Sequence, residues 1–135
     1  MNETQLIKGT KKRKKIFAVI AGVFSACIVA QIFIAGLAIF DTPLHWGVHR
    51  FFVHFFDKLA LLLFVMSFIC KMPASIRWQS GAMVFLIYLM YFSANVSALV
   101  LWGAALHPVF AMTLFTLSVY CTVQSWKTTR EVESQ

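Results

Sequence analysis

The run "IFAVIAGVFSACIVAQIFIAGLAIF", residues 16–40, holds 25 residues without one charged side chain. A helix needs about 20 such residues to cross the hydrocarbon core of a bilayer. The run is too long for the apolar region of a secretory signal, which has about 7–15 residues. It also ends without a clear small-x-small cleavage site. We therefore expect a retained membrane helix at this position.

The rest of the chain repeats this composition. Of the 135 residues, 60% are hydrophobic and 13% are charged, whereas a soluble domain is about 45–50% apolar and about 25% charged. The sequence therefore predicts an all-α protein, an integral membrane four-helix bundle. The expected helices cover residues 16–40, 48–70, 78–101 and 107–126. A basic segment (1–15) precedes this domain of residues 16–126, and a short tail (127–135) follows it.

The charge distribution predicts the orientation in the membrane. Six of the twelve basic residues lie in "KGTKKRKK", residues 8–15, directly before the first apolar run. Lys71 and Arg77 flank the second connection, and Lys127 and Arg130 follow the last apolar stretch. The other two connections hold no Lys or Arg. The positive-inside rule then places both termini in the cytoplasm of a multi-pass plasma-membrane protein. The basic segment suits anionic lipid rather than nucleic acid.

This topology gives each polar residue a depth. The stretch "HWGVHRFFVHFFDK", residues 45–58, holds three of the four histidines. Gln31, Asn95, Asp57 and all four histidines fall at the outer surface or in the outer half of the predicted bundle. Ionisable groups inside a membrane are expensive and usually functional. We therefore expect a site in the outer half, and we expect Asp57 to face the bundle and to hydrogen-bond His54.

Two of the histidines suit a haem. His49 and His107 lie on parallel helices, within about one turn of the same level, and haem iron held by two histidines needs imidazoles at matching depth. Arg50 at the wet interface suits the propionates. Gly36 permits close approach, and His54 is a deeper, reserve ligand. Phenylalanines for the slot are Phe33, Phe40, Phe52, Phe56 and Phe110. The predicted cofactor-binding residues are His49, His107, Arg50, Gln31, Gly36 and His54, around one haem b.

Other readings of the same residues stay open. Interfacial histidines and phenylalanine stripes occur without any ligand. His45, His49 and Asp41, with or without His54, are a candidate Zn or Cu site, since HxxxH places two imidazoles on one helix face. Alternatively, the polar stripe that starts at Arg50 is a docking surface of a structural or assembly subunit. No phosphate-binding loop or nucleophile elbow occurs, so the sequence favours a binding or electron-transfer protein over an enzyme.

Three stretches carry a resemblance to known proteins: "VAQIFIAGLAIF" (29–40), "HWGVHRFF" (45–52) and "ALHPVFAMTLF" (105–115). Together they resemble a widespread family of small four-helix bacterial membrane proteins and, more distantly, one four-helix half of heme A synthase. The resemblance covers about residues 25–120. It implies that His49 and His107 are axial haem ligands, with Gln31 near the pocket.

The chain also departs from the synthase. It has half the length, lacks the second half-bundle and has no glutamate two or three residues before His49. The resemblance therefore implies a haem-binding bundle rather than a synthase. One haem in the outer half does not cross the bilayer. A quinone, a redox partner subunit or an outer acceptor is expected as partner, and an oligomer is possible.

Overall fold

The computed structural model describes residues 3–96 and 100–131, and these residues are helical apart from short connections. The elements in chain order are α1 (Glu3–Phe40), α2 (His45–Ile69), α3 (Ala74–Val96), the 3-10 helix η1 (Leu101–Ala105) and α4 (Leu106–Glu131). Four helices are long and apolar enough to cross a membrane. The prediction of an all-helical chain with four helices of membrane-spanning length is thus confirmed. The ends differ from the apolar stretches, since α1 includes the basic segment and α2 begins at His45.

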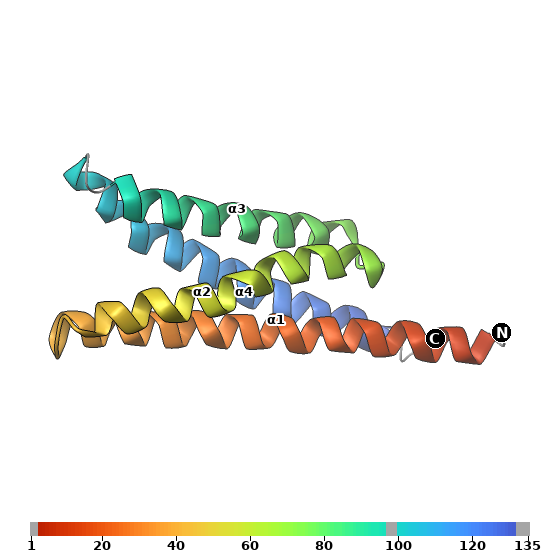
Figure 1. Cartoon of the computed structure of the whole chain (residues 1–135). Coiled ribbons are helices and arrows are strands. Elements are labelled where there is room, and N and C mark those ends of the chain that lie inside the picture. Colours follow the sequence, from red (N-terminus) through yellow and green to blue (C-terminus); the bar gives the residue numbers. More distant parts are fainter. Residues whose placement is uncertain (1–2, 97–99, 132–135) are drawn as a thin grey trace.

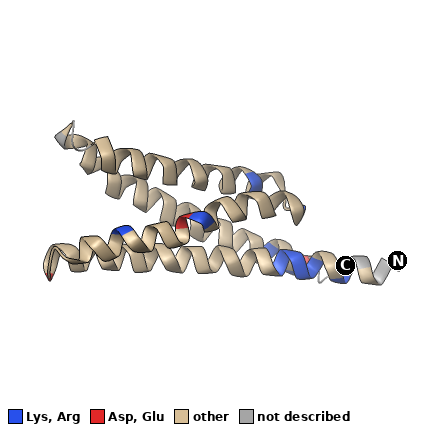
Figure 2. Ribbon diagram, in the orientation of Figure 1, with Lys and Arg blue, Asp and Glu red and all other residues tan. Residues whose placement is uncertain are grey.

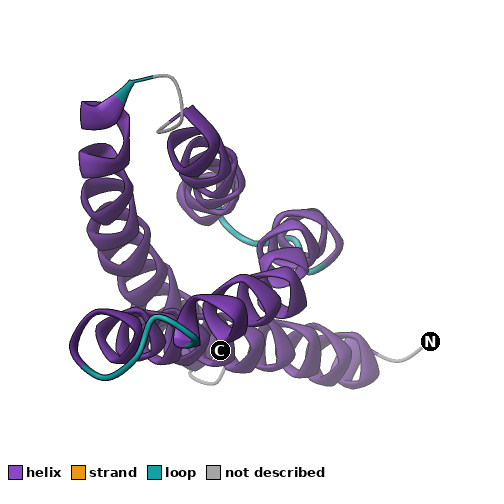
Figure 3. Cartoon of the chain, turned by 60° about the vertical axis from the view of Figure 1, so that its left-hand side comes forward, coloured by secondary structure: helices purple, strands orange, loops and turns teal. Residues whose placement is uncertain are grey.

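The four long helices form a ring of neighbours. α1 packs against α2 and α4, and α3 packs against the same two helices, whereas within the described residues α2 and α4 do not pack on each other. In Figure 1 the α1–α2 pair and the α3–α4 pair separate toward the end that carries the α1–α2 turn and η1. Figure 3 shows short loops joining the helices. Side chains that meet between α2 and α4 must therefore reach across the centre of the bundle.

The positive charge gathers at the opposite end. Figure 2 shows the basic residues of α1 at the end where α1 begins and α4 ends. The α2–α3 connection lies at this end as well (Figure 1). Helix α2 ends there in a Schellman motif. The backbone amide of Met72 donates to the carbonyl of Ser67 at 2.9 Å, and Lys71 has a φ of 50°. Glycine is the usual residue at that left-handed position.

Apolar side chains lie both in the core of the bundle, for example Phe24 and Leu63, and over its outside. Large apolar side chains cover the outside, for example Phe51 at 76% and Phe55 at 72% exposure. Small hydroxyl side chains lie inside, where they permit close approach and hydrogen bonds between helices. Fully or almost fully buried hydroxyl residues are Ser67, Ser80, Ser93, Ser118, Ser125 and Thr129. Ser25 of α1 lies 3.1 Å from the Ser118 hydroxyl of α4.

Candidate functional site

His49 and His107 meet in the space between α2 and α4. The centroids of their rings are 6.5 Å apart and the ring planes are inclined by 56°. His49 lies on the second turn of α2, and His107 is the second residue of α4. The structure thus brings together the two histidines that the sequence places at one depth. Both are only partly exposed.

The ring of His107 is oriented by α3. Its Nδ1 lies 3.2 Å from the carbonyl oxygen of Met90 and 3.2 Å from the hydroxyl oxygen of Ser93. The Ser93 hydroxyl itself donates to the Met90 carbonyl at 2.9 Å. A carbonyl oxygen only accepts, so Nδ1 of His107 carries the proton. The neutral ring then keeps its lone pair on Nε2, the atom available to a metal.

His49 is held from the other side. The amide nitrogen of Gln31 on α1 donates to the backbone carbonyl of His49 at 2.9 Å. The Trp46 ring meets the His49 ring edge-on, with centroids 5.4 Å apart. Within the described residues, Nδ1 of His49 and Oε1 of Gln31 are buried without a hydrogen-bond partner. Such atoms are rare in native proteins and call for an explanation. Both atoms belong either to His49 or to the glutamine that holds its backbone, so these unpaired polar atoms lie at the histidine pair.

The phenylalanines expected around a haem lie partly inside and partly outside the bundle. Phe52 and Phe56 pack together on α2, with centroids 5.3 Å apart. Phe33 and Phe40 are 66% and 90% exposed, so their predicted place in the slot is wrong. Both side chains lie on the face of α1 that is turned away from the bundle. A Cβ atom added to Gly36 meets nothing within 4 Å, so no neighbouring helix packs against this residue, and its predicted place beside a haem stays a prediction. Arg50 is exposed, next to His49.

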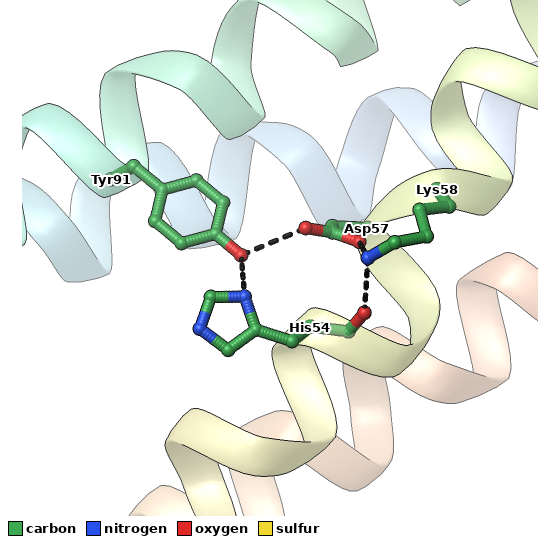
Figure 4. A network of polar contacts seen from close by, with 4 residues as sticks. All are labelled: His54, Asp57, Lys58 and Tyr91. Atoms are coloured by element: carbon green, nitrogen blue, oxygen red, sulfur yellow. Dashed lines mark hydrogen bonds and ion pairs between the residues drawn. The ribbon is translucent and has the colours of Figure 1, made fainter.

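His54 belongs to a separate cluster between α2 and α3, shown in Figure 4. Its Nδ1 lies 3.0 Å from the Tyr91 hydroxyl oxygen, and that hydroxyl donates to Oδ2 of Asp57 at 2.9 Å. Lys58 donates to Oδ1 of Asp57 at 3.0 Å and to the His54 carbonyl at 2.6 Å. The reserve role of His54 is therefore not supported, because its ring turns toward α3. Asp57 faces the bundle as predicted, with 18% exposure.

The predicted direct bond between His54 and Asp57 is wrong because Tyr91 stands between them (Figure 4). The sequence reasoning missed Tyr91, which reads there as an ordinary aromatic residue of an apolar stretch. His45, at the start of α2, pairs with Asp41 at 2.9 Å. In the part of the chain that the structure describes, no three His, Cys, Asp or Glu side chains gather as metal ligands.

Residues 31–98 match a family of unknown function, DUF6220. The chain belongs to this family. The segment that matches DUF6220 includes Gln31, His49, Ser93 and the cluster around Tyr91. His107 lies beyond the end of this segment. No curated protein and no solved structure gives a match. The comparisons show no relation to heme A synthase.

Proposed function

We propose that this protein is a membrane haem protein that holds one b-type haem between His49 and His107 and acts in electron transfer or haem handling. The observation that supports it is the distance of 6.5 Å between the two ring centroids. A metal ion bound by two imidazole nitrogens at about 2.0–2.1 Å each holds the ring centroids roughly 6 Å apart. The observed separation of the two rings is close to that value, which supports a bis-histidine site.

The neighbours of the two histidines fit the same role. Metal-binding histidines usually donate their second ring N–H to a carbonyl or carboxylate, which fixes the tautomer. His107 has such a partner in Met90. Gln31 anchors the backbone at His49, and the exposed guanidinium of Arg50 suits the carboxylates of a haem. When bound, the haem would supply one-electron redox chemistry, at a potential tuned by the histidines that hold it and by their hydrogen bonds.

The proposal includes a location. The end of the bundle with the basic residues of α1, Lys71 and Arg77 is assigned to the cytoplasm of a bacterial inner membrane by the positive-inside rule. His49 and His107 lie toward the other end of α2 and α4. One haem near the outer side does not carry electrons across the bilayer. A quinone or a partner subunit is therefore needed as electron donor or acceptor.

A divalent-metal site has less support. His45 and Asp41 pair with each other, and His54 turns toward Tyr91. His45 and Asp41 thus form one pair, whereas His49 lies beside His107 and His54 beside Tyr91, so the candidate Zn or Cu ligands do not gather at one point. The structural-subunit reading becomes the favoured one only if the histidine pair binds nothing.

An absorption spectrum tests the proposal. Protein purified from haem-replete cells should show a Soret band and sharp reduced α and β bands, as low-spin six-coordinate iron does. His49→Ala and His107→Ala should each abolish binding or convert the iron to high spin. His45→Ala is the matched control, because His45 lies one turn before His49 and pairs with Asp41. A colourless wild-type protein that contains neither haem nor iron would overturn the proposal.

A further inference from the structure

The cluster of His54, Asp57, Lys58 and Tyr91 lies in the middle of a candidate membrane span. α2 runs from His45 to Ile69, so Asp57 is its central residue. The Lys58 side chain is 74% exposed on the outside of the bundle, and His54 is exposed as well. Polar atoms that face hydrocarbon without a partner are costly. We therefore expect that a ligand or partner within the membrane supplies a polar group to this surface.

The hydrogen bonds fix what His54 offers to such a group. The ionised carboxylate of Asp57 only accepts, so the single hydroxyl proton of Tyr91 goes to Oδ2. The Tyr91 oxygen then accepts from Nδ1 of His54, which carries the proton of the neutral ring. Nε2 is left as an unprotonated acceptor. It points away from Asp57 in Figure 4 and has no partner among the described residues.

Two candidate binding partners for this surface, a phospholipid head group and a second copy of the chain, do not suit it. Phospholipid head groups lie at the faces of a hydrocarbon core about 30 Å thick, so they do not reach its middle. In a parallel dimer through this face of α2, a two-fold axis along the membrane normal would set the exposed Lys58 of one copy against that of the other. Like charges repel strongly where water is scarce. A molecule that dissolves in the hydrocarbon and brings a hydroxyl donor matches both the acceptor at Nε2 of His54 and the exposed apolar side chains beside it.

We propose that this surface binds the ring of a membrane-dissolved quinol, with a quinol hydroxyl donating to Nε2 of His54. Phe51 and Phe55, on the same helix, are largely exposed and offer apolar contact to the ring and its tail. The hydrogen-bond series from Nε2 through Tyr91 then connects the bound hydroxyl with Asp57 (Figure 4). The inference rests on the membrane placement and names the electron donor that the proposed haem function needs.

The test uses the full-length chain in lipid nanodiscs with all four histidines labelled with ¹⁵N. Titration with decyl-hydroquinone should shift the unprotonated nitrogen of His54 and leave His45 unchanged. The dimethyl ether of the same hydroquinone has no hydroxyl proton, and it should bind about threefold to tenfold more weakly, the range of one hydrogen bond. His54→Phe should lose the response to the hydroxyl, whereas His45→Phe, the matched control, should keep it.

A second variant tests the hydrogen bond between Tyr91 and Nδ1 of His54. Tyr91→Phe removes the oxygen that accepts from Nδ1, so the proton of His54 should become distributed over both ring nitrogens. Equal affinity for the hydroquinone and its ether, or a hydroquinone response at His45 alone, would overturn the inference. So would a His54 signal that changes with the protein-to-lipid ratio and not with hydroquinone, because a second copy would then cover the face.

The result is separable from the haem proposal. A colourless protein whose His54 responds to hydroquinone rejects the haem and keeps the quinol site. A haem-loaded protein without that response rejects the quinol site alone.

Discussion

Replacing Asp57 with asparagine tests whether its carboxylate holds α2 and α3 together. The carboxylate is 18% exposed and accepts hydrogen bonds from Tyr91 at 2.9 Å and from Lys58 at 3.0 Å. Hydrogen bonds to charged groups contribute about 1.5–3 kcal/mol each, and removing one partner of a fully buried ion pair costs about 3–5 kcal/mol, which is an upper bound here because Lys58 is 74% exposed. Asparagine keeps a weakened bond to Tyr91. We therefore expect Asp57→Asn to lower the free energy of unfolding by about 3 kcal/mol.

A double-mutant cycle separates the ion pair from other effects of the substitution. Lys58→Met alone leaves the carboxylate bound to Tyr91, and the lysine side chain is largely exposed, so the expected loss is about 1–2 kcal/mol. The double variant leaves no uncompensated charge between α2 and α3. Its loss should fall short of the sum of the two single losses by about 2 kcal/mol, as residues in one network usually do.

The assay is equilibrium unfolding in mixed micelles, followed by the helical circular dichroism signal. Asp41→Asn is the control, because Asp41 also accepts from one neighbour but is 65% exposed. Exposed pairs contribute about 0.2–1 kcal/mol, so this control should lose no more than that. Equal losses for the Asp57 and Asp41 variants, or additive single losses, would refute the reasoning.

Two further predictions concern the ends of the bundle. Single cysteines at Thr42 and Ala104 should react with an impermeant maleimide from outside the cell, and one at Ser75 should not, while native Cys70 stays slow because burial raises the pKa of its thiol and keeps it protonated near pH 7; the reverse pattern would invert the topology. Lys71→Gly should stabilise the protein by about 1 kcal/mol, because Lys71 has a φ of 50° that glycine adopts without strain, and unchanged unfolding would contradict this.

The helices were predictable because composition alone leaves few alternatives. A run of 25 uncharged residues such as 16–40 must be buried in protein or in lipid, and a chain of 135 residues has too little polar surface to cover four of them. The ends of the helices were less predictable. α1 continues to Glu3 because the basic residues before Ile16 are good helix formers, although they are not apolar.

The meeting of His49 and His107 was predictable for a similar reason. Depth follows from sequence position once the topology is chosen, and both histidines lie near the starts of helices that run in the same direction. Rotation about the helix axis is a different matter. His54 follows His49 by five residues, which turns its side chain by roughly 140° on an α-helix. That rotation, rather than depth, directs His54 to Tyr91 and removes it from the pair.

The partners of these histidines were not predictable from residue types. Ser93 and the Met90 carbonyl reach His107 only because α3 presents that side to α4, and a backbone carbonyl leaves no mark in a sequence. Tyr91 joins His54 to Asp57 from the next helix. Such contacts depend on the relative rotation of two helices, which the residue types of either helix alone do not specify.

The same rotation explains how α2 serves two sites. His49 faces the centre of the bundle, and His54 faces α3 and the outside, yet their spacing of five positions corresponds to only about 7.5 Å along the helix axis. A ligand bound at Nε2 of His54 would thus lie within about one and a half helical turns of the level of the histidine pair. An electron donor placed there is close to a haem at His49 and His107 without sharing any ligand with it. His54→Phe should therefore leave the haem spectrum intact, while His49→Ala should leave the hydroquinone response of His54 intact.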